Sequence, residues 1–188
     1  VQLSPPDKHG YCTLGTSCDA TRAAIDGARI VIAEINERMP RTHGNTFVHL
    51  DRISAFVHTD RPLPHGHVAE IGPIEAQIGE QIAALIEDGS TLQMGIGAIP
   101  DAVLARLGNK HDLGVHTEMF SDGLLPLLQS GVVNNKHKKV HRGRTTTSFV
   151  NGTKKLFDFV DDNPLVEFHP CDRTNDTALI RDNPKVVA

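Results

Sequence analysis

Short apolar stretches alternate with amphipathic stretches along the chain, and this alternation limits the folds that the chain can adopt. Between residues 73 and 87 apolar side chains recur every three or four positions, which predicts a helix with one buried face. The stretch 29–35 is instead apolar with little alternation, as expected of a strand that is covered on both faces. Strands that alternate with helices in this way are typical of an α/β domain with a mainly parallel sheet.

The other expected elements continue this alternation. The pattern predicts further strands over 91–96, 113–119, 145–150 and 166–169. It predicts further helices over 17–27, 100–108, 122–129 and 153–160. Ser17 or Asp19 is suited to cap the first of these helices. The stretches 40–49 and 58–72 are polar or rich in proline and predict connections. Because both ends of the chain resemble interrupted strands, we expect an internal fragment of a longer protein.

Composition excludes several classes of function. The chain has 188 residues, of which 39% are hydrophobic and 22% charged, so it is able to bury a core of ordinary size. It contains no Trp and carries a formal net charge of −4, which argues against nucleic acid as a partner. No apolar run approaches the roughly 20 residues that a transmembrane helix needs. Three cysteines at unrelated spacings predict neither disulfides nor a zinc site, so we expect reduced thiols in a cytoplasmic protein.

The most informative stretch is a glycine-rich turn between a predicted strand and a predicted helix. Gly95 and Gly97 let the backbone approach a ligand closely, and the free N–H groups of the following helix can face an anion or a polarised oxygen. The next predicted strand delivers Glu118 at its carboxyl end, where open α/β sheets place ligand groups. The sequence therefore predicts a carboxylate near a backbone pocket that suits a carbonyl oxygen.

A dinucleotide site is the alternative explanation of this arrangement. In such sites a Gly-x-Gly-x-x-Gly turn is followed about 20 residues later by an acidic residue that holds the ribose. The spacing from Gly95 to Glu118 is compatible with that pattern, but Pro100 occupies the position of the third glycine. The close packing of helix on strand that this glycine provides is then lost, which disfavours a nicotinamide cofactor.

Several longer segments of the sequence resemble the acetyl-CoA hydrolase/transferase family, and within it the 4-hydroxybutyrate CoA-transferases. The resemblance spans essentially the whole chain, and its two most specific segments surround the glycine-rich turn and Glu118. The segments that carry it are Ser4–Asp7, Gly44–His49, Glu87–Gln93, Gly95–Leu104, His116–Gly123, Phe157–Phe159 and Asn163–Pro164.

The resemblance implies a fold and a set of site residues. The fold would be a three-layer α/β/α domain of the kind shared by CoA-transferases and related sugar-phosphate isomerases. Residues 1–70 would end an N-terminal domain, and residues 71–188 would begin a second domain that carries the site. Glu118 aligns with the catalytic glutamate of the family. The segment that contacts coenzyme A aligns with Gly95, Ile96, Gly97, Ala98 and Ile99.

The function that the resemblance implies is transfer of coenzyme A between a short-chain acyl-CoA and a free carboxylate. The reaction uses coenzyme A as co-substrate. We expect no metal, because an ionised glutamate is able to attack a thioester without further activation. An acetyl-CoA hydrolase, which lets water attack the acyl-enzyme, is an alternative. A catalytically silent acyl-CoA or nucleotide-binding module is another. Members of the family usually form homo-oligomers, so we expect one here, with no membrane as a partner.

Other polar clusters receive simpler interpretations. His65-x-His67 lacks an acidic or cysteine partner at a convincing spacing, so we interpret it as a solvated loop rather than half of a metal site. His116 lies two residues before Glu118, and packing or a backbone hydrogen bond is the favoured role for it. The basic run 136–142 could attract the phosphates of coenzyme A, but a solvated face is the favoured interpretation.

Overall fold

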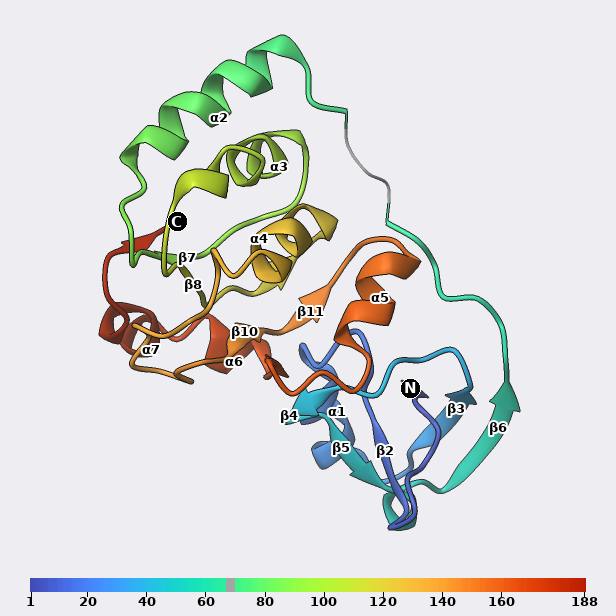
Figure 1. The fold of residues 1–188 in the computed structure, drawn as a ribbon. Coiled ribbons are helices and arrows are strands. Elements are labelled where there is room, and N and C mark those ends of the chain that lie inside the picture. Colours follow the sequence, from blue (N-terminus) through green and yellow to red (C-terminus); the bar gives the residue numbers. More distant parts are fainter. Residues whose placement is uncertain (67–69) are drawn as a thin grey trace.

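The structure is a computed structural model that describes residues 1–66 and 70–188. A layer of short parallel strands lies at its centre (Figure 1). One three-stranded sheet has the order β13–β7–β8, and a second has the order β10–β12–β4. A parallel bridge between His116 and Thr146 joins β8 to β10, so the two sheets form one layer. The strands are β4 (His43–Gly44), β7 (Thr91–Leu92), β8 (Gly114–Val115), β10 (Thr145–Thr147), β12 (Val166–Phe168) and β13 (Val186–Val187).

Helices lie on both sides of this layer; in Figure 1, α2 and α3 are above the strands, and α6 and α7 are below them. A Cβ atom at Gly79 of α2 would lie 2.7 Å from the carbonyl carbon of Ala102, so glycine lets α2 pack closely on α3. The predicted α/β class with a mainly parallel sheet is confirmed. The helices are α2 (Pro73–Leu85), α3 (Ala98–Leu104), α4 (Leu125–Gln129), α5 (Lys154–Val160), α6 (Cys171–Thr174) and α7 (Thr177–Asp182).

The first 60 residues build a smaller unit beside the layer. Its parallel sheet has the order β1–β3–β6, and β2 pairs with β5 in an antiparallel arrangement. Leu3 and Ile35 on this sheet are fully buried. β4 connects the unit to the layer, because it pairs with β12. The elements are β1 (Gln2–Leu3), β2 (Tyr11–Thr13), α1 (Thr21–Gly27), β3 (Ile32–Asn36), β5 (Phe47–His49), β6 (Ala55–Thr59) and a 3₁₀ helix, η1 (Leu50–Arg52).

Two predicted strands are broken in the structure. The strand expected over 113–119 is interrupted after the bridge at His116 and resumes as β9 (Met119–Phe120). The strand expected over 145–150 is interrupted at Ser148 and resumes as β11 (Phe149–Val150), which pairs with β9. The 3₁₀ helices η2 (Leu107–Asn109) and η3 (Asp122–Leu124) complete this part of the fold. Both interruptions lie at the carboxyl edge of the parallel layer, and Glu118 lies in the first.

Some expectations for the remaining elements were wrong. α1 begins after Ala20, and neither Ser17 nor Asp19 caps it; the backbone of Ser17 instead forms a bridge with Phe149. The stretch 40–49 contains β4 and β5, and 58–72 begins with the end of β6. Strands of two or three residues leave little periodicity in a sequence, because cross-strand pairing and not local pattern stabilises them. The helices α6 and α7 were not predicted.

The basic run 136–142 was interpreted as a solvated face, but Lys138 in this run is buried. Its side chain is only 2% exposed and lies against Gly114 of β8. The ammonium donates to the carbonyl oxygens of Val115 and Arg144 at 2.6 Å each, and to Thr146 Oγ1 at 2.9 Å. Burial lowers the pKa of Lys138 to about 7, while the three oxygen acceptors satisfy its donors. Lys138 thereby ties β8 to β10 at the point where the two sheets meet.

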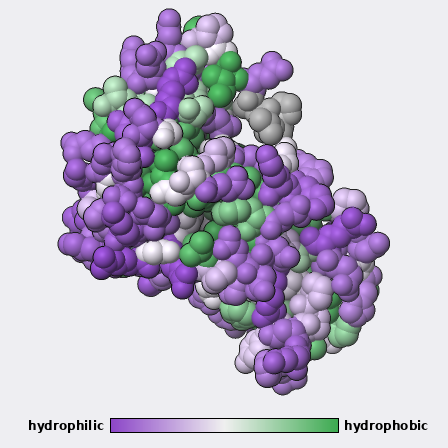
Figure 2. Space-filling model, viewed as in Figure 1, coloured by the Kyte–Doolittle hydropathy of each residue, from purple (hydrophilic) through white to green (hydrophobic). Residues whose placement is uncertain are grey.

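The surface in the view of Figure 2 is mostly hydrophilic, and apolar atoms gather near its middle, over the central strands. Of the helices in residues 1–66 and 70–188, none is both long and apolar enough to cross a bilayer.

We predict that Gly44→Ala destabilises the fold more than Gly131→Ala does. Both glycines have positive φ, +98° and +80°, so alanine strains the backbone at either position, by about 1–2 kcal/mol. At Gly44 the new Cβ would also lie 2.3 Å from the Phe168 carbonyl oxygen, whereas at Gly131 nothing lies within 4 Å. The clash should add about 1–3 kcal/mol to the loss of unfolding free energy, measured by urea denaturation. Equal losses of unfolding free energy in the two variants would contradict the inference that Gly44 is needed for its close contact with Phe168.

Candidate active site

The candidate site lies at the carboxyl edge of the parallel layer. The glycine-rich segment follows β7, the bend with Glu118 follows β8, and the loop with Asn175 follows β12 and α6. Because the strands are parallel, these three segments leave the layer at the same edge, where ligands of open α/β sheets bind. The predicted position of Glu118 at a strand end is therefore confirmed, although the strand itself is shorter than expected.

The glycine-rich segment forms the entry to α3. Gly97 has φ of +118° and precedes Ala98, the first residue of the helix, so the helix begins two residues earlier than predicted from Pro100. The first N–H groups of a helix have no partner within it and are free to bind another acceptor. Ile96 and Ile99 in this segment are 42% and 41% exposed. The segment thus presents free backbone donors beside exposed apolar side chains.

Glu118 is half-buried in the bend between β8 and β9. Its Oε2 accepts a hydrogen bond from Asn175 Nδ2 at 2.9 Å. Its main-chain oxygen accepts from the N–H groups of Ser148 and Phe149 at 2.8 and 3.0 Å. The backbone of the glutamate is therefore held by the neighbouring strand, while its carboxylate is held by an amide from the loop after α6.

The glycine-rich segment and the Glu118 segment are connected to each other through side chains. Thr117 Oγ1 accepts from the N–H of Met94 at 3.1 Å, directly before Gly95. Ser121 Oγ donates to Asp101 Oδ1 on α3 at 2.9 Å. The two contacts therefore join the segments Gly95–Leu104 and His116–Gly123, one near the start of both segments and one further along them. No side-chain contact between Glu118 and residues 95–99 appears among the described hydrogen bonds, so the proximity of the two segments rests on the contacts of Thr117 and Ser121.

His116 lies under the site and fits the favoured expectation of a backbone hydrogen bond. It is 2% exposed, and its Nε2 lies 3.0 Å from the Thr174 carbonyl oxygen, next to Asn175. Nδ1 has no hydrogen-bond partner among the described residues. Burial and, to a smaller extent, the charge of Lys138 together lower the pKa of His116 to about 4. The neutral ring therefore donates from Nε2 to Thr174.

His141, Glu167 and His169 form a cluster of residue types that bind metals. In this structure the three side chains contact one another directly. Glu167 Oε2 lies 2.7 Å from His141 Nδ1 and 3.2 Å from His169 Nε2. Arg173 donates to His141 Nε2 at 3.0 and 3.2 Å from its two nitrogens, which requires the proton of His141 to be on Nδ1. A metal-bound Nδ1 must be unprotonated. Hydrogen bonds and ion pairs thus join the three side chains in this structure, and Arg144 lies 3.7 Å from Glu167.

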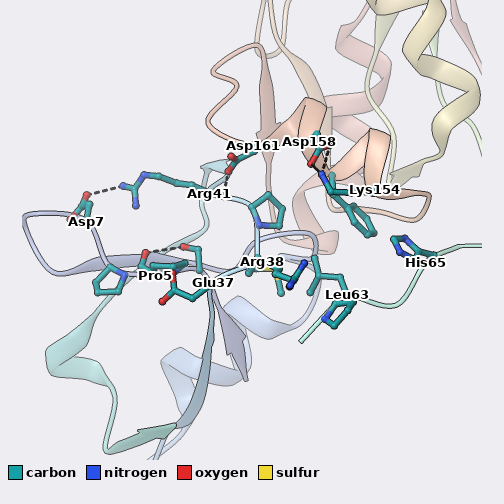
Figure 3. A pocket seen from close by; sticks show the side chains of 16 residues that line it. Pro5, Asp7, Glu37, Arg38, Arg41, Leu63, His65, Lys154, Asp158 and Asp161 are labelled. Carbon is teal, nitrogen blue, oxygen red and sulfur yellow. Dashed lines mark hydrogen bonds and ion pairs between the residues drawn. The ribbon is translucent and has the colours of Figure 1, made fainter. Parts of the chain in front are cut away.

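The largest described cavity lies elsewhere, between the N-terminal unit and α5 (Figure 3). It has a volume of about 660 Å³, and neither Glu118 nor residues 95–99 line it. Its charges are largely paired: Arg41 contacts Asp7 and Lys154 contacts Asp158 (Figure 3). His65 stacks near Phe157, and His67, the other half of the motif considered for a metal, lies outside the described residues. We retain the strand edge as the candidate site.

Solved structures show the class of protein to which this fold belongs. The chain superimposes on 4-hydroxybutyrate CoA-transferase from Porphyromonas gingivalis with a TM-score of 0.95 and 42% identity, over 99% of this chain and 48% of that one. The chain thus has the fold of part of a CoA-transferase. Sequence profiles of the N-terminal and C-terminal domains of the acetyl-CoA hydrolase/transferase family match residues 1–66 and 152–188. The chain belongs to this family.

Curated relatives agree with this assignment. Over its whole length the chain is 49% identical to 4-hydroxybutyrate coenzyme A transferase from Clostridium kluyveri, covering 44% of that protein. It is 46% identical to the succinyl-CoA:acetate/propanoyl-CoA:succinate CoA transferase of Fasciola hepatica, covering 40% of it. The chain therefore spans less than half the length of these relatives. The division of the chain near residue 70 stays a prediction.

Asn175 is the site residue that sequence reasoning missed. It lies 57 positions after Glu118, in a segment without a predicted element, and only the fold brings it to the carboxylate. The one available signal was Thr174-Asn175-Asp176, a polar group just before a helix. Such a group ordinarily indicates capping, and Asp176 does cap α7.

We predict that His116 makes folding stability depend on pH below about 6.5. An unfolded histidine takes up a proton near pH 6.5, whereas folded His116 does so only near 4, so stability is complete above pH 6.5 and is lost as pH falls toward 4. This contribution amounts to about 2 kcal/mol between pH 7 and pH 5. Urea denaturation at both pH values should show a smaller pH-dependent loss in His116→Gln than in the wild type.

His9→Gln, which changes an exposed side chain in the same way, is the control for this comparison. The pH-dependent loss should be smaller in His116→Gln than in His9→Gln. Contributions of His141 and His169 are present in all three proteins and cancel. An unchanged loss in His116→Gln would refute the assignment to His116.

Proposed function

We propose that the protein transfers coenzyme A between a short-chain acyl-CoA and a free carboxylate, through a thioester formed on Glu118. The observation that carries the proposal is a half-buried glutamate at the carboxyl edge of a parallel layer, oriented by an amide and linked to a glycine-rich turn. The named CoA-transferase activities of the relatives support the same reaction class. Acetyl-CoA and 4-hydroxybutyryl-CoA are the acyl donors that the proposal favours.

The first half of the reaction loads coenzyme A onto the protein. A carboxylate oxygen of Glu118 attacks the thioester carbon, the C–S bond breaks, and an acyl-glutamyl anhydride and the coenzyme A thiolate result. The thiolate then attacks the glutamyl carbonyl, which forms a glutamyl-CoA thioester and releases the first acid as a carboxylate. An incoming carboxylate repeats both steps in reverse and regenerates Glu118. No net proton is exchanged, so the steps require no general base.

Each step passes through a tetrahedral oxyanion, and the glycine-rich turn offers donors for it. We assign this role to the free backbone N–H groups near Gly97 and Ala98, where α3 begins. One such donor is typically worth about 3 kcal/mol of transition-state stabilisation. The exposed Ile96 and Ile99 beside them provide apolar surface for coenzyme A. Gly95 and Gly97 allow the backbone to approach the ligand, because they add no Cβ atom there.

Asn175 orients the attacking group in this scheme. Its amide donates to Oε2 of Glu118, so the other carboxylate oxygen is free to attack the thioester. No metal takes part in the proposed step. A homo-oligomer and a cytoplasmic location remain expectations of the sequence.

We predict that Glu118→Ala abolishes transfer and leaves coenzyme A affinity within a few-fold of wild type. Incubation of the protein, at its full natural length, with acetyl-CoA and borohydride should give a mass change on the peptide that contains Glu118. Glu118→Asp should lose about 100-fold in rate, because a shorter side chain misplaces the carboxylate by about 1 Å.

Glu80→Ala, which removes an exposed glutamate from α2, is the control and should retain both the rate and the mass change. Wild-type transfer by Glu118→Ala would refute the nucleophile. Labelled protein that releases only free acid, with no transfer to an acceptor acid, would favour the hydrolase. Binding of coenzyme A with neither reaction would favour the silent binding module.

We predict that Asn175→Ala lowers kcat by about 10- to 100-fold, the range expected for a lost hydrogen bond to a charged group. The affinity for coenzyme A should change little, since Asn175 contacts the carboxylate and not the glycine-rich turn. Asn134→Ala is a matched control, because Asn134 also donates to a carboxylate, that of Asp112, at 2.8 Å. Equal kcat values for the two variants would contradict the orienting role of Asn175.

A further inference from the structure

Two buried threonines lie at the two interruptions of the strands that surround Glu118. Thr117 directly precedes Glu118, and Thr147 directly precedes Ser148, where the neighbouring strand is interrupted. Both side chains are fully buried. Neither residue stood out in the sequence, since threonine is common in strands.

The Thr117 hydroxyl contacts both segments of the site. It accepts from the Met94 N–H at 3.1 Å, and its hydrogen faces the carbonyl oxygens of Met94 and Met119, each at 2.9 Å. Met94 is the residue before the glycine-rich turn, and Met119 is the residue after Glu118. The hydroxyl of the residue before Glu118 therefore connects the start of the glycine-rich turn to the residue after Glu118.

Thr147 repeats this geometry one strand further along the layer. Its hydroxyl donates toward the carbonyl oxygen of Phe149, two residues on, at 2.9 Å, as Thr117 does toward Met119. Its second acceptor is the carbonyl oxygen of Glu118 itself, at 3.2 Å. The N–H groups of Ser148 and Phe149 donate to that same oxygen. Thr147 thus contacts the main chain of Glu118, and Thr117 contacts that of the next residue, Met119.

The need for these hydroxyls follows from the interruptions. An uninterrupted strand would satisfy its backbone groups through ladder hydrogen bonds and would point residues 117 and 118 to opposite faces. The bend removes part of that ladder and turns the Glu118 side chain toward the edge of the layer. The Thr117 hydroxyl replaces a missing ladder bond at the Met94 N–H, so this donor loses its described partner when the hydroxyl is removed. The Thr147 hydroxyl adds a third contact to the Glu118 carbonyl oxygen, beside the two N–H groups. When these contacts are lost, the bend relaxes, and the carboxylate moves with it.

We infer that Thr117 is a positioning residue for the reaction at Glu118, and that Thr147 supports it from the neighbouring strand. This inference rests on the proposed function. Thr117 touches neither the acyl group nor coenzyme A in this scheme and acts only by fixing the distance between the glutamate and the glycine-rich turn. Its loss should therefore affect the chemical step and not the binding of coenzyme A.

The decisive variants are Thr117→Val and Thr117→Ser. Valine keeps the shape of the side chain and removes the hydroxyl, whereas serine keeps the hydroxyl. Thr117→Val should lower kcat, and the rate of borohydride-trapped labelling at Glu118, by about 10- to 100-fold, as expected for a shift of the reacting group by up to 1 Å. The dissociation constant for coenzyme A should stay within about three-fold. Thr117→Ser should restore most of the rate.

Thr13→Val is the matched control for a lost buried hydroxyl. Thr13 is also fully buried, and its Oγ1 lies 3.0 Å from Ser4 Oγ and accepts from the Thr42 N–H at 3.2 Å, in the N-terminal unit. Thr13→Val should lower Tm to a similar extent as Thr117→Val and leave kcat unchanged. This comparison separates positioning from a general loss of stability.

Three results would overturn the inference: a folded Thr117→Val with wild-type kcat, a Thr117→Ser as impaired as Thr117→Val, or a Thr13→Val with the same loss of kcat. If Thr117→Val does not fold, Thr147→Val takes its place with the same expected loss of kcat, and wild-type kcat there overturns the inference. Glu118→Ala is measured in parallel. Activity retained by Glu118→Ala refutes the proposed function itself, whereas loss there with wild-type kcat in Thr117→Val refutes only the positioning role.

Discussion

The parallel bridge between His116 and Thr146 is the contact on which the rest of the structure depends. It joins two three-stranded sheets into one layer and so brings the ends of β7, β8 and β12 to a common edge. Lys138 reinforces the junction from one face, with its ammonium bonded to oxygens of both strands. The cost of burying this charge is offset by three acceptors. Without this junction the glycine-rich turn and Asn175 would belong to separate sheets.

The site uses places where regular structure stops. Glu118 lies where β8 has ended and β9 has not begun, and Gly97 lies where β7 has ended and α3 has not begun. Backbone groups at such places need partners other than a ladder. Buried hydroxyls provide them beside Glu118, and the N–H groups at the start of α3 are left free for a ligand. Because regular structure stops at these places, the backbone beside Glu118 needs the threonine hydroxyls as partners. For the same reason, the N–H groups at the start of α3 are available to a ligand.

The class of fold and the places of the glycine-rich turn and of Glu118 in it were predictable, because each has a local signature. The helix over 73–85 follows from the spacing of its apolar residues, and Gly95, Gly97 and Glu118 follow from a strand, a turn and a strand end. Asn175 and the burial of Lys138 were not predictable, because both depend on contacts between residues far apart in the chain. Asn175 reaches a carboxylate 57 positions away, and Lys138 lies in a run that reads as a solvated face.

The sequence by itself determined the alternation of strands and helices, the place of the glycine-rich turn and the carboxylate at a strand end. Periodicity and glycine act over a few residues, so they are readable without a fold. The tertiary structure alone decided where strands break, which polar groups meet, and that the largest described cavity lies away from Glu118. Those outcomes depend on pairing between distant strands, whose free energy is set by burial and cross-strand contacts and not by the local sequence.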